Sequence, residues 1–538
     1  MSEAARAGLF RAGMLVMASS VTTMALGFLK NVLAAYYFGT SEAMDAYVMA
    51  LLVPDAAMHL AQTGVFNFVP LFAAERARSE ERAWDAAGKM LTYWLALLLA
   101  AVAVALLFTP QLVTLVAPGF AGARRAIALD LTRTLLMMAV FVGGARILAV
   151  TLHAERRFLA AGVSEGAFQV ASTLYLVAFH DRGIEALVWA QVFGGLVQLL
   201  VVAASLWTRR HRIRPSFDLA SAPVRQMLRL SFPVYLGEWG SKLNLVATRA
   251  FASLLPAGAV SALQYALMLV EMVPGVLAGA FTTALFPFLS DEFARRDQRL
   301  ARESLARALV TMLLVFAPLA AGLWVVANPL VTGLFERGSF DAESTRLTAT
   351  ALRIFAPITV ALALNALLGS AFHARRDTST PMTAGLIRFG SNTVLCAVLV
   401  PSLGYEAIAL AATVSTYLKL GYLLLFADRL VARADLWYAL RTALRIAPAV
   451  AAMVLVVEPL AALGSALGMR QTAALAFVAV LGLLGAATYL AALWVFCRPE
   501  LQHHLALLRQ GRRRGPAAGA PPATAPASGL DVPREARV

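Results

Sequence analysis

Long apolar runs recur along almost the whole chain, from Ala12 to Phe496. A helix that crosses a membrane needs about 20 consecutive apolar residues, and these runs leave room for about fourteen such helices joined by short loops. The composition agrees, because 60% of the residues are hydrophobic and 14% are charged, whereas soluble proteins contain about 25% charged residues. We therefore expect an all-α polytopic membrane protein with little chain left for a separate soluble domain.

The expected membrane spans follow these apolar runs. The first run is longer than the core of a signal peptide and contains Lys30 and Asn31, so we interpret it as a retained membrane helix. The spans are expected at approximately residues 12–38, 46–73, 90–116, 131–152, 158–179, 184–207, 227–255, 257–289, 305–334, 347–372, 382–400, 407–427, 443–463 and 472–496.

The basic residues are distributed unevenly between the loops. The chain has 46 Lys and Arg against 31 Asp and Glu, a net charge of +15, which in a soluble protein would suggest a nucleic-acid partner. Here the excess lies in the loops on the side of the N-terminus, so the positive-inside rule predicts that both termini are cytoplasmic, and no nucleic-acid partner is expected. The loops on that side include Arg76, Arg78, Arg156, Arg157, Arg209, Arg210, Arg295, Arg296, Arg375 and Arg376, and the opposite loops contain Arg124, Arg125, Arg182, Arg337, Arg346 and Arg470.

A sequence repeat with a period of about 220 residues divides the chain. The segment TPQLVTLVAPGF at 109–120 matches NPLVTGLFERGSF at 328–340, and GIEAL at Gly183 matches GYEAI at Gly404. The repeat predicts two pseudo-symmetric six-helix lobes that insert in the same orientation, with a cavity between them. The expected order is an N-terminal lobe at 1–208, a basic cytoplasmic linker at 209–219, a C-terminal lobe at 220–430, two additional transmembrane helices at 431–500 and a disordered basic Pro/Ala-rich cytoplasmic tail at 501–538.

A series of short motifs, in a fixed order, identifies a family. The motifs are GFLKNVLAAYYFG at 27–39, Asp45 with Ala46, Val53 with Pro54, FVPLF at 68–72, VAPGF at 116–120, LFPFLS at 285–290, LFERGSFD at 334–341 and HARRDTSTP at 373–381. Together they resemble the MurJ/MviN family, the lipid II flippases of the multidrug/oligosaccharidyl-lipid/polysaccharide exporter superfamily. The resemblance covers nearly the whole chain, including the two additional helices.

The resemblance implies a V-shaped pair of bundles that moves an undecaprenyl-pyrophosphate-linked saccharide across the bacterial inner membrane by alternating access. It implies a cationic cavity with arginines on the first, second and eighth helices, which hold the pyrophosphate, and an acidic residue at the start of the second helix. Members act in peptidoglycan and cell-wall biogenesis. Whether the chain also contacts the cell-wall or polysaccharide biosynthesis machinery is left open.

This chain matches the family's cavity only in part. Lys30 stands at the position of one first-helix arginine, and Asp45 matches the acidic residue at the start of the second helix. Asp45 is equally explained as a helix cap. The other family positions are replaced, and the chain has Met24, Met58 with His59, Thr63 and Met268 in their place. Three fixed cationic donors are therefore lost, which predicts weaker or different pyrophosphate recognition.

Charged residues inside apolar spans mark the candidate site, because a charge at mid-membrane usually faces a cavity or a partner. Lys30 is interpreted as a cavity ligand, with a structural pair to an acidic neighbour such as Glu271 as the alternative. Glu238 and Lys242 are spaced i,i+4 on the seventh span, which permits mutual neutralisation. Arg249 lies on nearly the same face of this helix, and its guanidinium group could donate two hydrogen bonds to a phosphate.

These residues receive separate roles. We expect Lys30, Arg249, Lys242 and His59 to bind the substrate in the cavity, and Asp45, Glu238 and Glu271 to couple conformational change. Arg388 and Lys419 lie on late helices of the second lobe, where the resemblance implies a groove for the lipid tail.

No catalytic or metal site is predicted, since the sequence has no phosphate-binding glycine loop, no HExxH motif and no metal-spaced cluster of His and Cys. Cys396 and Cys497 are interpreted as small apolar fillers. No cofactor is expected, and coupling to the membrane potential or to a monovalent cation stays open. Three alternatives remain beside lipid II transport: a flippase for an exopolysaccharide or other cell-surface glycan intermediate, a cation-coupled exporter of small amphiphiles, and a membrane glycan polymerase or ligase.

Overall fold

A computed structural model describes residues 3–62, 68–207, 214–218, 221–272, 274–275, 277, 298–375, 377–430, 433–467 and 471–496. Within these residues the chain folds into α-helices linked by short turns, and no strand occurs in this part of the chain. The linker at 209–219 falls partly outside the described residues, and the tail at 501–538 lies wholly outside them, as does Thr63.

The first half of the chain forms one bundle. Its helices pack mainly against one another, with α8 against α9, α7 against α9, and α1 against α8. They are α1 (Glu3–Phe38), α2 (Glu42–Ala50), α3 (Leu52–Gln62), α4 (Phe68–Arg76), α5 (Glu80–Leu107), α6 (Thr109–Val116), α7 (Gly122–Ala154), α8 (Phe158–Phe179) and α9 (Ile184–Leu206).

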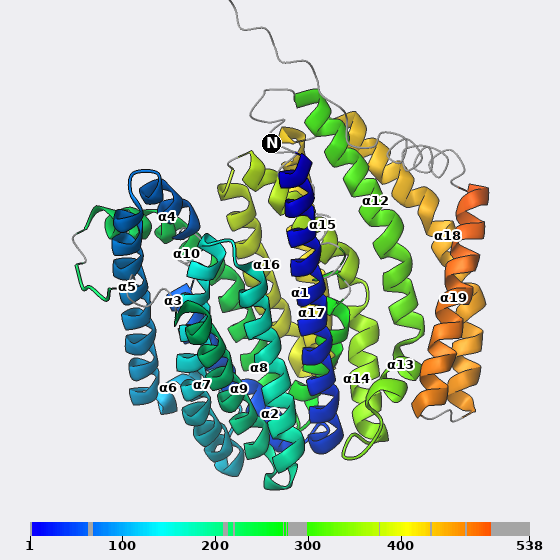
Figure 1. The fold of residues 1–538 in the computed structure, drawn as a ribbon. Helices are drawn as coiled ribbons and strands as arrows, with labels where there is room; N and C mark the ends of the chain where they lie inside the picture. The colour runs from blue at the N-terminus through cyan, green and yellow to red at the C-terminus, as the bar shows by residue number, and fades with distance from the viewer. Residues whose placement is uncertain are drawn as a thin grey trace, which may run out of the picture.

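The second half forms another bundle beside the first (Figure 1). Its last two helices lie on the outer side and pack on α12 and α13. The helices are α10 (Ala222–Ser253), Ala259–Met272, α12 (Gln298–Val325), α13 (Ala327–Phe335), α14 (Ala342–Phe355), α15 (Ile358–Ala374), α16 (Ser379–Leu403), α17 (Tyr405–Leu425), α18 (Arg433–Ala466) and α19 (Gln471–Phe496).

Several expected single spans are broken into two or more helices. The span expected at 46–73 is divided among α2, α3 and α4, and α5 and α6 divide the one expected at 90–116. The helices α14 and α15 are bent by 46° at a break before Ile358, where Pro357 lacks the N–H that would continue the helix. The repeated segments adopt the same local structure, since α6 and α13 are both short helices that follow a long one.

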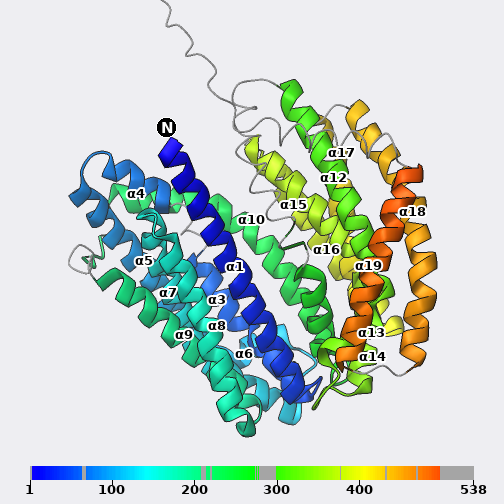
Figure 2. The ribbon, with the colours of Figure 1, turned by 45° about the vertical axis from the view of Figure 1, so that its right-hand side comes forward.

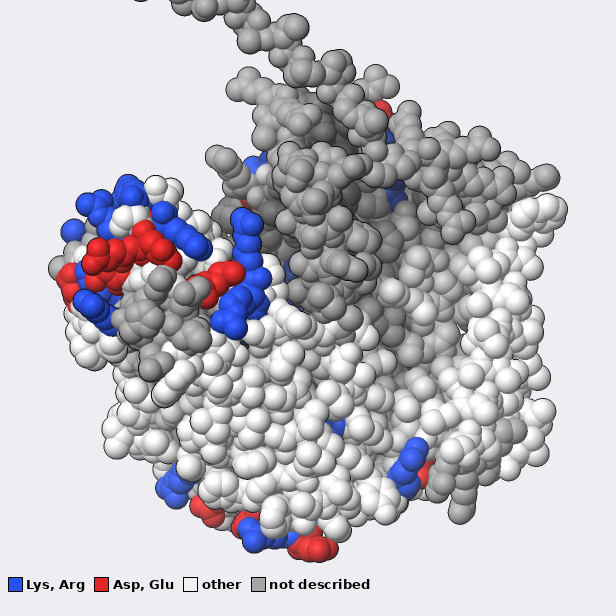
Figure 3. Space-filling view, viewed as in Figure 1, with Lys and Arg blue, Asp and Glu red and all other residues white. Residues whose placement is uncertain are grey.

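Helix length and hydropathy identify the candidate membrane spans. Among the described residues, eight helices are long and apolar enough to cross a membrane, or nine if the bent pair α14 and α15 is counted as one span. The expected number of about fourteen is not confirmed. The charged side chains visible on the face in Figure 3 gather at its two ends, and a broad band with almost none lies between them. This pattern is that of a multi-pass membrane protein.

The helix α10 connects the two bundles. It contacts α3, α4, α5 and α6 of the first half and α16 and α17 of the second. Figure 2 shows the two bundles diverging toward the end of the molecule where α1 begins, with α10 running obliquely between them. At the opposite end the bundles meet, and the contacts between them there form the candidate site.

Candidate functional site

Among the described residues, Asp45 is the most extensively bonded charged residue between the two halves of the chain. It lies in the first turn of α2, which begins after Ser41, whose hydroxyl accepts a hydrogen bond from the Met44 N–H. The Asp45 side chain is 0% exposed. Its Oδ2 accepts hydrogen bonds from Arg124 Nη2 at 2.6 Å and from the Gly258 N–H at 2.8 Å, and its Oδ1 accepts two from Ser261.

The Asp45 carboxylate caps a helix of the other bundle. The Gly258 and Ser261 N–H groups stand at the start of the helix Ala259–Met272, where backbone donors lack partners within the helix. A carboxylate is also favoured at this positive end of the helix dipole. Gly258 has a φ of +89°, and a Cβ there would lie 2.8 Å from the Thr40 carbonyl oxygen. Glycine therefore lets the two halves approach closely enough for the cap.

Further hydrogen bonds close the same end of the molecule. The Thr40 and Ser344 hydroxyls lie 2.8 Å apart, and the Ser339 N–H donates to the Tyr36 carbonyl at 2.8 Å. We call this set of contacts, with those of Asp45, Arg124, Gly258 and Ser261, the Asp45 gate. Beside it, the N–H and hydroxyl of Ser344 donate to the N-cap residue Asp341 and hold the pKa of its carboxyl below the ordinary value.

Aromatic side chains from both halves pack next to the gate. Tyr265, Phe335 and Phe340 form a cluster with ring centroids 5.4 to 5.7 Å apart, and Phe28 of α1 lies 6.5 Å from Phe335. Tyr265, Phe335 and Phe340 are at most 2% exposed. Such packing excludes water, so the hydrogen bonds of Asp45 are made in a dry environment, where they are strong.

Lys30 is directed into the first bundle. Its Nζ donates to Gln191 Oε1 of α9 at 3.1 Å and lies 4.7 Å from the centroid of the Phe168 ring of α8. Gln191 in turn donates to the Tyr47 hydroxyl at 2.6 Å, two residues after Asp45. Lys30 is 6% exposed, and in this conformation its contacts with Gln191 and Phe168 lie within the first bundle. The alternative pairing of Lys30 with Glu271 and its role as a substrate ligand stay predictions.

Lys242 pairs across the two halves, with a residue that the sequence analysis did not select. Its Nζ on α10 donates to Asp55 Oδ2 of α3 at 2.7 Å. His59, one helical turn after Asp55, places Nε2 3.8 Å from Asp55 Oδ1. The side chain of Glu238 lies outside the described residues, so its expected pairing with Lys242 stays untested. An acidic residue four positions before His59 in an apolar span was the signal that could have identified Asp55.

Arg249, Glu271 and Arg388 form a looser group in the second half. Arg249 Nη2 donates to Gln264 Oε1, whereas Arg249 Nη1 and Arg388 Nε are buried and have no hydrogen-bond partner within the part of the chain that the structure describes. Both guanidinium groups interact electrostatically with Glu271. The structure therefore brings Arg388, which was assigned to a lipid-tail groove, within electrostatic range of Glu271, which was assigned to conformational coupling. Arg249, which was assigned to substrate binding, also lies within electrostatic range of Glu271. Lys419 lies on α17.

The methionines at positions where the resemblance implies arginines contribute apolar or weakly polar contacts. Met58 is 6% exposed. The Met268 sulfur accepts a hydrogen bond from the Asn31 side-chain amide at 3.1 Å, which joins the two halves. The Met24 methyl group approaches Gly275 of the second half, at 3.7 Å from where a Cβ would stand. Two of the three methionines thus take part in contacts between the halves.

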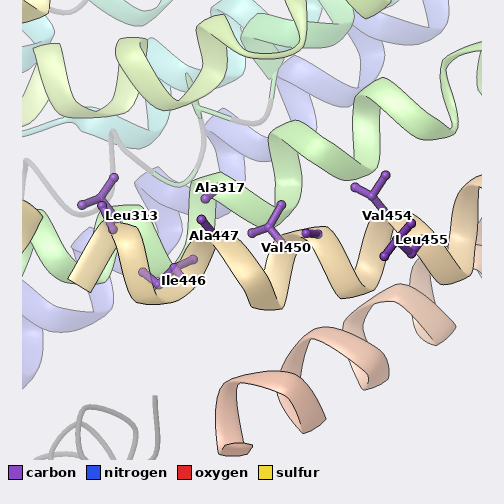
Figure 4. A pocket seen from close by; sticks show the side chains of 9 residues that line it. Leu313, Ala317, Ile446, Ala447, Val450, Val454 and Leu455 are labelled. Atoms are coloured by element: carbon purple, nitrogen blue, oxygen red, sulfur yellow. The ribbon is translucent and has the colours of Figure 1, made fainter. Parts of the chain in front are cut away.

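An apolar groove lies between α12 and α18 (Figure 4). It has a volume of about 560 Å³, and its lining includes Leu313, Ile446, Val450 and Leu455. Neither Arg388 nor Lys419 lines it, so the assignment of these two residues to a lipid-tail groove stays a prediction. Cys396 is buried, as expected for an apolar filler, and Cys497 lies outside the described residues. No group of metal-ligating side chains is found among the residues that the structure covers.

Comparisons with known proteins agree on one family. The family model described as "Lipid II flippase MurJ" matches residues 34–490. A probable lipid II flippase MurJ of Rhizobium tropici is 30% identical over 407 residues, which cover 73% of this chain and 76% of the relative. A solved structure of lipid II flippase MurJ in an inward closed conformation has a TM-score of 0.72 at 21% identity and covers 91% of this chain and 100% of its own.

A solved multidrug resistance MATE family transporter of the MOP superfamily, in an inward-facing conformation, is similar in fold. Its TM-score is 0.64 at 14% identity, over 76% of this chain and 98% of its own. The family model, the sequence relative and the fold agree with the motifs on which the resemblance was based. This chain belongs to the MurJ family of lipid II flippases, which are transporters and not enzymes.

Proposed function

We propose that this protein translocates lipid II, the undecaprenyl-pyrophosphate-linked precursor of peptidoglycan, across the bacterial inner membrane by alternating access. The family supports the substrate class. The fold supports the transport mechanism, because two bundles joined at one end can open at either side of a membrane in turn.

The observation that carries the proposal is the cap that Asp45 places on a helix of the opposite bundle. This contact depends on how close the two bundles are, so it forms when the gate closes and is lost when the gate opens. The gate lies at the end opposite to the start of α1. With both termini in the cytoplasm, as the basic loops favour, this conformation is closed to the periplasm and faces inward.

The charged residues between the halves support an anionic headgroup as cargo. Lys242 and Arg249 both lie on α10, the helix that contacts both bundles, and the side chains of Lys242 and His59 are partly exposed. A diphosphate accepts charge-assisted hydrogen bonds from such groups. We further propose that the membrane potential or a monovalent cation supplies the driving force, and that cell-wall biosynthesis enzymes provide the substrate.

A second substrate is favoured by one specific observation, the methionines Met24, Met58 and Met268 at positions where the family resemblance implies cavity arginines. Each charge-assisted hydrogen bond that a methionine cannot make could forfeit about 1.5 to 3 kcal/mol of binding free energy. A flippase for an exopolysaccharide or another cell-surface glycan intermediate is therefore the alternative to lipid II.

The test is complementation of a bacterium depleted of its own lipid II flippase, with membrane insertion of this protein verified. We expect growth and lipid II translocation to be restored. A correctly inserted protein that fails to restore either, while it moves a different polyprenyl-diphosphate glycan in vesicles, would transfer the assignment to the alternative substrate. Formation of a glycosidic bond by the purified protein would instead indicate an enzyme.

A further inference from the structure

Asp55 lies between two groups that the proposed transport mechanism would use for an anion. The carboxylate on α3 is held by Lys242 Nζ at 2.7 Å from α10, and His59 Nε2 lies 3.8 Å away on its other oxygen. The three side chains thus bring together one acid and two basic groups from the two helices. A carboxylate in this position neutralises the positive charge with which a substrate anion would pair.

The contact has the properties of an exchangeable pair. The side chains of Asp55, Lys242 and His59 are 38%, 26% and 41% exposed, so each retains access to solvent or to an entering ligand. Ion pairs that keep contact with water contribute little net stability, because solvent screens them and competes for the charged groups. An anion with more charge and more acceptor oxygens can therefore replace a carboxylate here.

We propose that Asp55 is a built-in competitor of the substrate headgroup: in the empty protein its carboxylate occupies the place beside Lys242 and His59 that a diphosphate takes when a polyprenyl-diphosphate lipid is bound. The identity of the ligand rests on the proposed function. The subsite itself rests on the observed contacts between α3 and α10.

Exchange at this subsite would change both recognition and the contact between the halves. A neutral or singly charged amphiphile gains little by displacing an aspartate, whereas a diphosphate offers more acceptor oxygens and more negative charge to the same two groups. Binding would also separate Lys242 from Asp55, which removes one link between α10 and α3. Asp55 therefore selects for a strongly anionic headgroup.

The experiment measures binding to the purified full-length protein in lipid nanodiscs. The probes are undecaprenyl pyrophosphate and, as the uncharged control, undecaprenol. Asp55→Asn removes the competing charge and should tighten undecaprenyl pyrophosphate binding about three- to fivefold, with undecaprenol unchanged. Lys242→Ala should weaken undecaprenyl pyrophosphate binding about tenfold or more. The double variant should bind undecaprenyl pyrophosphate more weakly than Asp55→Asn, because it lacks the lysine that the diphosphate would contact.

A matched control comes from another aspartate–lysine pair. Asp85 and Lys89 lie 2.9 Å apart within α5, at a distance similar to that of Asp55 and Lys242. Asp85→Asn should leave the affinity for both probes unchanged. Tighter binding in this control would attribute the effect of Asp55→Asn to net charge and overturn the subsite.

The remaining outcomes also decide the proposal. Unchanged or weaker undecaprenyl pyrophosphate binding by Asp55→Asn overturns it, as does an equal gain for undecaprenol. Should Asp55→Asn fail to insert, Lys242→Ala decides alone, because the subsite requires its affinity to fall. The proposed function is tested separately. If the binding pattern holds but the protein does not restore lipid II translocation, the proposed function is wrong. If translocation is restored but the binding pattern is absent, the subsite is wrong.

Discussion

Asp45 and Asp55 stand ten positions apart on neighbouring helices of the first bundle, and both bond to the second half of the chain. Asp45 is 0% exposed and accepts four hydrogen bonds, three of them from backbone or hydroxyl groups of the other bundle. Asp55 is 38% exposed and is held by one lysine, with a histidine nearby. The same residue type thus serves two kinds of contact.

The difference shows how burial determines what a carboxylate can do between two moving bodies. A buried carboxylate with fixed donors strongly stabilises one geometry. Removing it is costly, because its donors stay buried without an acceptor. A partly exposed carboxylate bound by a flexible lysine can exchange that partner at little cost. We therefore expect substitutions at the Asp45 gate to change the conformational equilibrium, and substitutions at Asp55 to change ligand affinity.

The largest effect is expected for Asp45→Ala. It leaves Arg124 and two N–H groups of the other bundle without their acceptor, which should disfavour gate closure by about 3 to 5 kcal/mol. Closure is measured by disulfide formation in a Thr40→Cys/Ser344→Cys protein that lacks Cys396 and Cys497, since the two native hydroxyls lie 2.8 Å apart.

Crosslinking should slow by roughly a hundredfold or more, and lipid II translocation should be lost. Asp55→Asn in the same background is the control and should crosslink within about fivefold of the parent rate. If the two aspartate variants crosslink at similar rates, the contrast between the two sites is wrong.

An intermediate effect is expected for Arg124→Gln. Arg124 donates to Asp45 and also stacks on the Phe120 ring, at 4.1 Å from its centroid. Its loss removes this charge-assisted hydrogen bond and a longer one to the Leu255 carbonyl at 3.4 Å. The three bonds from Gly258 and Ser261 remain, so closure should weaken by about 1.5 to 3 kcal/mol. The crosslinking rate should fall between those of the parent and Asp45→Ala. A rate as low as that of Asp45→Ala would mean that Arg124, and not the helix cap, closes the gate.

The smallest effect is expected for Ser261→Ala, which removes one hydroxyl bond but leaves the N–H that completes the cap. Closure should weaken by about 0.5 to 1.5 kcal/mol, a severalfold decrease in crosslinking rate. Transport should persist at a reduced rate, as measured by complementation. Complete loss of transport would indicate that the Ser261 hydroxyl has a function beyond closing the gate.

The sequence was sufficient to predict the features of the fold that depend on patterns over many residues. The apolar runs predicted an all-α membrane protein, and the repeat matched the two segments that form the short helices α6 and α13. The interruptions inside expected spans were harder to predict, because proteins tolerate Pro and charged residues inside apolar runs when neighbouring helices supply partners.

The site was predicted less completely, because its contacts join residues far apart in sequence. Asp45 was found through its place in a family motif, yet its three donors at Gly258 and Ser261 lie more than 200 positions away. For Lys30, the partner Gln191 is 161 positions away and uncharged, so no charge pattern could indicate it. Asp55 was missed because the i,i+4 spacing had predicted that its partner, Lys242, pairs with Glu238.

The helix α10 bonds to both bundles within a short stretch, and this limits how the bundles can move. Lys242 is bonded to α3, and six positions later the Thr248 hydroxyl accepts a hydrogen bond from Asn392 on α16 at 2.8 Å. Fewer than two helical turns separate the two anchor points. While both bonds hold, a rotation of one bundle against the other bends α10 in that stretch. The stretch includes the buried Asn244, whose side-chain oxygen has no hydrogen-bond partner among the described residues.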